Sequence, residues 1–202
     1  MDKKEIILQA AEELFAEKGF DATSVKDLSQ RANVNVAMIS YYFGSKEKLL
    51  ETLIENKSND LYTSLQNLNS QNKDPFAKLE SLIDIYIERI FNNSNYFLIT
   101  QRELFLKQRG GTHEAIMRIH AKNVEEIRKL LDEGQKQKLF RKVDTDLLMA
   151  TISGTIFNVK KKEYFTQDTT LPLEETEAAT NKVKKQVKKH LYEMLRAYLE
   201  IK

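Results

Sequence analysis

Apolar and polar residues recur with helical spacing through the first fifty positions of the chain, and this pattern predicts short helices. The first helix is expected over residues 3–18, where the apolar side chains fall on one face. Gly19 is suited to end this helix, and Phe20 then folds back as the apolar residue past the cap. The apolar face consists of Ile7, Ala10, Ala11, Leu14 and Phe15.

Two shorter helices separated by a tight turn follow. Ser24, with an aspartate three positions later, has the pattern of a capping box and starts the first of them. Asn35 closes a turn of about three residues and is a suitable cap for the second, expected over residues 36–43. Ile39 and Phe43 are spaced to point into the core. Two helices joined in this way form a helix-turn-helix.

Almost the whole chain beyond residue 50 has a helical pattern, since 202 residues contain only two prolines and no stretch alternates with the period of a strand. Breaks are expected near residues 69–73, 92–95 and 109–112, and an exposed connection over 166–177. The helices between them are predicted at about 46–69, 75–91, 96–107, 113–134, 144–162 and 178–200. The fold class is therefore all-α, with an amino-terminal three-helix bundle containing the helix-turn-helix and a larger carboxyl-terminal helical domain.

Composition and charge narrow the class of protein. The 32 basic and 30 acidic residues nearly balance, which argues against a general nucleic-acid coat and a membrane-surface protein. The chain has no cysteine, which fits a reducing cytosol. Acidic residues interrupt the amino terminus where a secretory signal would be apolar, and no apolar run approaches the ~20 residues of a membrane span. We expect a cytoplasmic protein without a membrane partner, a metal or a cofactor.

The order of these features resembles a known family. A helix ending in Gly-Phe is followed by a cap, a helix, a turn and a second helix, and then by Tyr-Tyr-Phe-Gly-Ser-Lys-Glu-Lys-Leu-Leu at 41–50. This order resembles the amino-terminal domain of the tetracycline-repressor (TetR) family of bacterial transcriptional regulators over about residues 5–54. Beyond that point the resemblance rests on length and helix plan. It implies a helix-turn-helix DNA-binding domain at 1–48 and a helical effector-binding and dimerisation domain at 49–202.

The resemblance also implies which residues contact DNA. The base-facing positions of the family match Val36, Ala37, Met38 and Ser40, with Tyr41 beside them. Lys26, on the preceding helix, matches a position from which family members reach bases or phosphates. The phosphate-contacting positions match Ser24, Tyr42 and Lys46. The apolar side chains at the base-facing positions favour thymine-methyl contacts or shape readout over bidentate pairs. Three alternatives stay open: a packing role for Tyr41, partial burial of Met38, and a helix-turn-helix that binds no DNA.

The last two predicted helices carry apolar stripes, and two such helices from each subunit resemble the four-helix dimer bundle of the family. The expected interface residues are Leu148, Ile152, Gly154, Ile156, Val187, Leu191, Leu195 and Tyr198. Gly154 would allow close approach of the two helices. The alternative, that these stripes only close the core of the monomer, stays open.

In the family, a small molecule bound among the central helices changes the separation of the recognition helices, which must be about 34–36 Å for successive major grooves. Candidate pocket residues are polar side chains within apolar helices: Tyr86, Tyr96, Arg102, Glu103, His120, Asn123 and Asn158. A purely structural role stays open for each of them. The aromatic residues nearby favour a hydrophobic or aromatic effector.

An enzyme and an interaction scaffold are the competing classes. The three histidines lack the His-x-x-x-His and Glu-x-x-His spacings of helical metal sites, and neither a glycine-rich phosphate loop nor a nucleophile elbow occurs. The lysine-rich outer face of the last helix is typical of a solvated surface. The sequence therefore predicts a DNA-binding transcriptional regulator, a ligand-responsive repressor that binds a two-fold symmetric operator as a homodimer.

Overall fold

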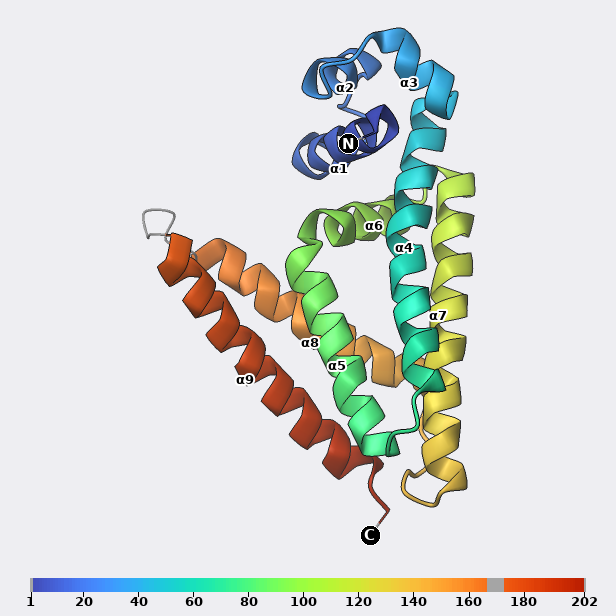
Figure 1. Cartoon of the computed structure of the whole chain (residues 1–202), viewed down its shortest axis with the longest axis vertical. Coiled ribbons are helices and arrows are strands. Elements are labelled where there is room, and N and C mark those ends of the chain that lie inside the picture. Colours follow the sequence, from blue (N-terminus) through green and yellow to red (C-terminus); the bar gives the residue numbers. More distant parts are fainter. Residues whose placement is uncertain (1, 167–172, 202) are drawn as a thin grey trace. The chain divides into compact units, whose positions relative to one another are not determined.

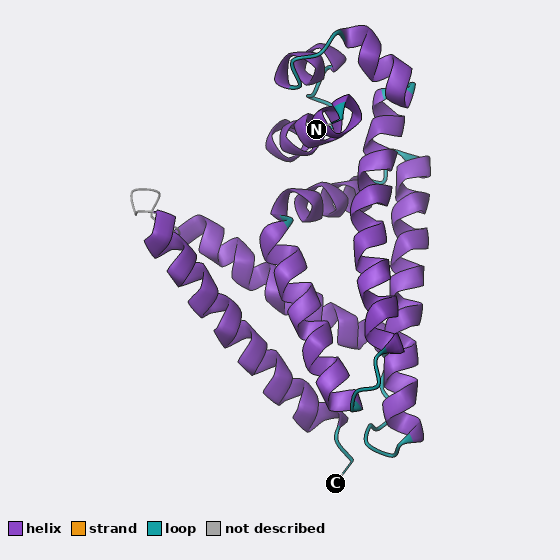
Figure 2. Cartoon of the chain, viewed as in Figure 1, coloured by secondary structure: helices purple, strands orange, loops and turns teal. Residues whose placement is uncertain are grey.

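A computed structural model of the chain describes residues 2–166 and 173–201, with side chains over 2–161 and 176–201. Every regular element within these ranges is an α-helix (Figures 1 and 2), so the all-α fold is confirmed. The one β pairing in the described part is an isolated bridge between Phe140 and Glu200. The helices are α1 Lys3–Lys18, α2 Val25–Arg31, α3 Val36–Phe43, α4 Lys46–Ser70, α5 Pro75–Asn92, α6 Ser94–Leu106, α7 Gly110–Lys136, α8 Thr145–Thr166 and α9 Leu173–Leu199.

Contacts divide the chain into two compact units. The first unit is Met1–Asp60 with Asn93–Ala121, and the second is Leu61–Asn92 with Lys122–Lys202. The first unit extends past the three amino-terminal helices because α6 packs on α1, and because the start of α4 shares their buried core. This division differs from the functional boundary between residues 48 and 49, which stays a prediction.

The predicted end of α1 is confirmed. Gly19 has a φ of 85°, which a side chain would strain, and its N–H donates to the carbonyl of Phe15. The ring of Phe20 lies 5.3 Å from that of Phe15, so the chain folds back as expected. The hydroxyl of Thr23, a completely buried residue, donates to the carbonyl of Gly19 over 2.7 Å. These contacts fix the turn between α1 and α2.

Local signals also set the helix-turn-helix. The Ser24 hydroxyl and the Asp27 carboxylate form the predicted capping box at the start of α2. The amide of Asn35 accepts a hydrogen bond from the Ala37 N–H over 2.9 Å and caps α3. Ile39 and Phe43 are 1% and 8% exposed, so they hold the inner face of α3 in the core as predicted.

Two predicted helix boundaries, the starts of α7 and α9, are wrong. The break expected at residues 109–112 lies earlier, because α6 ends at Leu106 and α7 already begins at Gly110. Lys107 turns the chain with a φ of 49°, and the carbonyl of Arg109 accepts the N–H of His113. Glycine is unfavourable chiefly in the middle of a helix, so Gly110 and its neighbour are tolerated at the first two positions of α7. Of the predicted connection at 166–177, residues 167–172 lie outside the described part, and 173–177 belong to α9.

The second unit is built on α5. Both α8 and α9 pack against α5, and α8 crosses it in Figure 1. Lys78, only 2% exposed, donates to the carboxylate of Glu133 over 2.6 Å and to the carbonyl of Asn69 over 3.2 Å. Asn69 in turn donates to the buried carboxylate of Glu126 over 2.8 Å. This network ties the end of α4, the start of α5 and the second half of α7 together.

Candidate nucleic-acid interface

The outer face of α3 is the part of the first unit that is suited to enter a DNA groove. Val36, Ala37, Ser40 and Tyr41 are exposed, and this spacing places all four on one side of the helix. The opposite side is anchored by the buried pair Ile39 and Phe43 described above. A short helix held on one side and exposed on the other can lie in a major groove without unfolding.

The structure decides the alternatives for the aromatic and sulfur-containing residues of α3. Tyr41 is 82% exposed, so a packing role for it is wrong. Its ring lies edge-on to that of Tyr42, with centroids 5.1 Å apart. Met38 and Tyr42 are half-buried and pack against the core of the first unit, so each presents only part of its side chain outward.

Ser24 lies at the amino-terminal end of α2, where exposed N–H groups favour an anion. Its hydroxyl oxygen accepts from the Asp27 N–H over 3.0 Å, and the hydroxyl also donates to the Asp27 carboxylate, so a phosphate would compete with that carboxylate for the hydroxyl hydrogen. The Asp27 carboxylate accepts the Ser24 N–H over 2.9 Å, and this backbone hydrogen bond lowers the pKa of Asp27. Asp27 therefore stays ionised in the capping box.

Lys46 has partners within its own unit. Its ammonium donates to the carbonyls of Phe20 and Thr23 over 2.9 and 2.8 Å and lies 4.2 Å from the centroid of the Phe20 ring. Two of its three N–H donors are therefore committed to the turn between α1 and α2. The phosphate contact implied by the family resemblance stays a prediction, and it would depend on the remaining donor.

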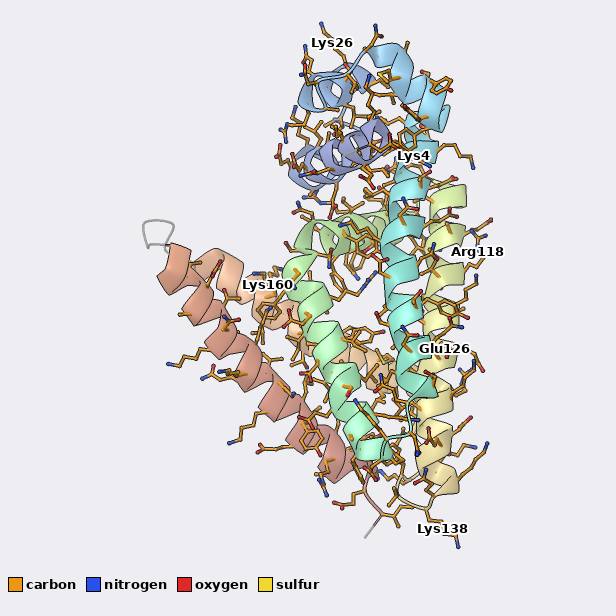
Figure 3. All side chains as sticks on the ribbon, in the orientation of Figure 1. Lys4, Lys26, Arg118, Glu126, Lys138 and Lys160 are labelled. Carbon is orange, nitrogen blue, oxygen red and sulfur yellow. The ribbon has the colours of Figure 1, made fainter. Side chains whose placement is uncertain are left out.

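Arg31 and Lys48, two other cations of the first unit, are paired with acids. Arg31 bridges Glu13 and Glu17 on α1, over 2.9 and 3.1 Å, and these hydrogen bonds raise the pKa of Arg31. Lys48 donates to the carboxylate of Glu51 over 2.6 Å, which raises the pKa of Lys48. Lys26 is exposed and points away from the helices of the first unit (Figure 3). Lys26 is therefore the cation of α2 and α3 best placed for DNA.

Some supporting residues escaped the sequence analysis. Lys4 is exposed, and its ammonium lies 6.0 Å from the ring centroid of Phe43, at the end of α3. Arg109, from the α6–α7 connection, donates to the carboxylates of Glu103 and Asp21 and stacks 4.2 Å from the centroid of the Phe20 ring. These contacts join segments far apart in the chain, so no local pattern could have indicated them.

Four of the seven predicted effector residues lie in the first unit, and three of these four have structural partners. The Tyr96 hydroxyl lies 2.6 Å from that of Ser58. Arg102 donates to the carbonyls of Phe15 and Ala16 at the end of α1, over 3.3 and 2.8 Å. Glu103 is 4% exposed and paired with Arg109. His120 is exposed, and its role in an effector pocket stays a prediction.

The other three effector candidates lie in the second unit. Tyr86 is 9% exposed, and burial raises the pKa of its hydroxyl. Asn158 is exposed and donates to the carbonyl of Gly154 in its own helix, and its role in an effector pocket stays a prediction. Asn123 is 7% exposed, and its side-chain oxygen has no hydrogen-bond partner among the described residues. Asn123 is therefore the candidate with an unsatisfied buried acceptor.

A cavity of about 280 Å³ lies in the first unit, beside the turn after α1. Arg102 and Glu103 line it together with Phe15, Phe20, Ile99 and Leu106, among others. Five charged residues line it. Asp21, Arg102, Glu103 and Arg109 are engaged with each other or with backbone carbonyls, as described above, and the fifth is Lys18.

Most of the predicted interface residues are buried within the protomer. Leu148, Ile152, Ile156, Val187, Leu191 and Leu195 are 0–6% exposed in the single chain. Their assignment to a dimer interface is therefore wrong, because α8 and α9 use these stripes to pack on α5 and on each other. Gly154 is half-buried and Tyr198 is 45% exposed, so both remain accessible to a partner. The outward face of α8 instead presents Leu147, which is 68% exposed.

Within residues 2–161 and 176–201, no group of three histidine, cysteine or acidic side chains is arranged to hold a metal ion. None of the described helices is long and apolar enough to cross a bilayer.

The all-α fold and the exposed outer face of α3 are typical of a regulator of the helix-turn-helix class. The family model described as "Bacterial regulatory proteins, tetR family" matches residues 7–53, and the model "Tetracyclin repressor-like, C-terminal domain" matches residues 75–194. The chain therefore belongs to the TetR family of bacterial transcriptional regulators, as the sequence predicted.

Known relatives agree with this assignment. The chain is 32% identical over 143 residues to "Probable HTH-type transcriptional regulator YttP" of Bacillus subtilis, covering 67% of this chain and 66% of YttP, just under two thirds of that protein. It is 26% identical to the HTH-type transcriptional repressor KstR2 of Mycobacterium tuberculosis, covering 74% of this chain and 75% of KstR2. The solved structure of the fatty acid degradation regulator FadR from Bacillus halodurans is similar in fold, with a TM-score of 0.73 at 22% identity over 95% of each chain.

Proposed function

We propose that this chain is a cytoplasmic transcriptional repressor that binds a two-fold symmetric DNA operator as a homodimer and is released by a small-molecule effector. The observation that carries the proposal is the arrangement of α3, whose inner face is anchored by Ile39 and Phe43 while its outer face is exposed. The repressor KstR2 among the relatives supports the sign of regulation. We assign no catalytic role to the chain.

In this proposal one set of side chains contacts the bases and a second set contacts the phosphates. The outer face of α3 faces the bases with Val36, Ala37, Met38, Ser40 and Tyr41. Ser24, Lys26 and Tyr42 contact phosphates and set the register of the helix on the duplex. Lys46 contributes to DNA binding mainly by stabilising the turn between α1 and α2. Few unpaired cations surround α3, so we expect a modest dependence of affinity on salt.

Dimerisation uses the outward faces of α8 and α9 rather than the buried stripes. Leu147 supplies an exposed apolar side chain, and Gly154, about two turns further along α8, leaves room for a helix of the partner. On α9, Tyr198 is an accessible aromatic residue, and its ring lies 4.0 Å from the Arg141 guanidinium. A two-fold contact of this kind would pair each face with its own copy.

The effector binds in the second unit, where Asn123 offers a buried oxygen without a partner among the described residues. An unpaired buried acceptor is unfavourable, and a ligand that donates a hydrogen bond to it would remove that penalty. We therefore expect an effector that combines a hydrophobic or aromatic body with at least one N–H or O–H group. Binding would release DNA only if the ligand prefers the conformation with the wrong spacing of recognition helices.

A footprint on the DNA that flanks the coding region of this protein tests the proposal. We expect a protected site with two-fold symmetry that survives an excess of unrelated duplex. The matched control is a double variant of the full chain, with Val36→Asp and Ala37→Asp together. It should fold normally and lose the footprint, since it adds negative charge to the exposed face of α3. Binding without sequence preference, or equal binding by that variant, would contradict the proposal. Mass spectrometry of the purified protein, followed by a footprint with any ligand found, tests release.

A further inference from the structure

The recognition helix lacks the side chains that usually identify bases. Its eight residues, Val36–Phe43, contain no arginine, lysine, asparagine, glutamine, aspartate or glutamate. Bidentate contacts to guanine or adenine in the major groove come from arginine, lysine, asparagine and glutamine. The helix itself therefore cannot make such a contact, and its polar contacts are limited to the single hydroxyls of Ser40, Tyr41 and Tyr42.

The residue that precedes the helix does not replace the missing groups. Asn35 is exposed, but its side-chain oxygen accepts the Ala37 N–H over 2.9 Å as the cap of α3. A bidentate contact with adenine needs that oxygen as an acceptor and the amide nitrogen as a donor at the same time. Reading adenine in this way would require the same oxygen to accept a second hydrogen bond while the cap fixes its orientation.

What the helix does present at its first turn is apolar. Val36 is 45% exposed and Ala37 is exposed, so both can contact a groove. Ser40 lies one turn further along, on the same face. The C5-methyl group of thymine is the apolar group that the standard base pairs display in the major groove, and aliphatic side chains recognise it by contact.

We propose that Val36 and Ala37 are specificity-determining residues that read thymine by packing against its C5-methyl group, with Ser40 adding one hydrogen bond. This inference rests on the proposed function, since it assumes that α3 enters the major groove. The operator half-site then contains thymines at the positions opposite the first turn of α3. Removal of one methyl group from such a thymine should lower the affinity about fourfold, the equivalent of ~0.8 kcal/mol for a buried methylene-sized group.

Replacement of thymine by uracil tests this directly, because uracil keeps every hydrogen-bonding group of thymine and lacks only the methyl. The operator is first selected from a random duplex library with the full-length protein. Each thymine of the half-site is then replaced singly by deoxyuridine, and the affinity is measured by fluorescence anisotropy. We expect about a fourfold loss at one or two positions and no change at the others.

A Val36→Ala variant assigns the contact to a side chain. The affinity of this variant for the thymine-containing operator should fall. The loss of affinity caused by uracil at the position facing residue 36 should nearly vanish in the variant. Lys26→Ala is the matched control, since it should weaken binding while keeping the full uracil penalty. Circular dichroism melting of both variants confirms that the first unit is folded.

The outcomes separate this inference from the function on which it rests. Specific binding with no uracil penalty at any position would overturn methyl reading and favour recognition through DNA shape. An unchanged penalty in Val36→Ala and in a companion Ala37→Gly variant would overturn the assignment to these residues. Failure of the selection to enrich any sequence would instead overturn the proposed DNA-binding function.

Discussion

The guanidinium of Arg109 donates two parallel hydrogen bonds to the buried carboxylate of Glu103, over 2.8 and 2.9 Å. These bonds raise the pKa of Arg109 and fix the end of α6 to the connection that follows it. The same guanidinium reaches Asp21 in the turn after α1 over 2.9 Å. The pair thus joins α6 to the turn between α1 and α2. Glu103 also lines the cavity beside that turn, and its role in an effector pocket stays a prediction.

Removal of this arginine should destabilise the first unit. An Arg109→Ala variant leaves Glu103 buried without its partner, which we expect to lower the free energy of unfolding by about 3 kcal/mol. Arg118→Ala is the control, because the Arg118–Glu55 pair has side chains 61% and 51% exposed and should contribute less than ~0.5 kcal/mol. Urea denaturation measures both, and equal losses in the two variants would contradict this role.

Lys46 and Lys26 should differ in their effects on DNA binding. Lys46→Ala removes two hydrogen bonds to backbone carbonyls and should lower the free energy of unfolding by about 1–2 kcal/mol, with little change in the salt slope. Lys26→Ala should leave stability unchanged and reduce the slope of log affinity against log salt by about 1. Titrations at several salt concentrations distinguish them. A reduced slope at unchanged stability in Lys46→Ala would show a direct phosphate contact instead.

Leu147 should be required for the dimer. A glutamate at this exposed position adds a charge to the proposed two-fold face without entering the core of the protomer. We expect Leu147→Glu to sediment as a monomer at micromolar concentration with unchanged helicity. Phe105→Glu is the matched control, because Phe105 is 84% exposed on α6 and should not affect association. Dimers of Leu147→Glu as stable as the wild type would exclude this face.

Acid should weaken the second unit through Glu126. Burial raises the pKa of this carboxyl, but hydrogen bonds from Lys129 and Asn69 outweigh burial and lower it. A depressed pKa contributes stability above the unfolded value of about 4.3, and this contribution disappears as the pH falls through the folded value. Glu126→Gln should therefore be less stable than the wild type at pH 7, with a difference that shrinks below about pH 4.

Urea midpoints across this pH range test the linkage. Glu125→Gln serves as the control, because Glu125 is 54% exposed beside Arg128 and should show a much smaller difference. A difference for Glu126→Gln that is constant with pH would mean that its ionisation is not linked to folding.

Gly134 should not tolerate a side chain. A Cβ atom there would overlap the ring of Phe140, which is 2% exposed and packs 4.8 Å from the ring of Phe76. We expect Gly134→Ala to cost about 1–3 kcal/mol of unfolding free energy, measured by thermal or urea denaturation. Gly110→Ala is the control, since a Cβ atom at that position would have no neighbouring atom within 4 Å. A neutral Gly134→Ala would show that the Phe140 ring can move aside.

The elements that could be predicted from the sequence depend on neighbours a few residues apart. The capping box of Ser24, the cap of Asn35 and the turn at Gly19 involve contacts within one helical turn, and all three are present as predicted. The same short-range signals supported the family assignment, which the family models confirm. The start of α7 was missed because glycines are tolerated in a first turn as well as in a break.

The sequence by itself thus determined the helices, the helix-turn-helix and the family, because caps and periodicity act within one turn of the chain. Only the tertiary structure decided which face of α8 and α9 is buried and which partners Arg102 and Arg109 hold. Arg102 is 87 residues from Phe15, and Arg109 is 88 residues from Asp21. An amphipathic stripe specifies that one face of a helix is buried. It does not specify whether that face packs on the core of its own protomer or on the partner subunit, since both present an apolar surface.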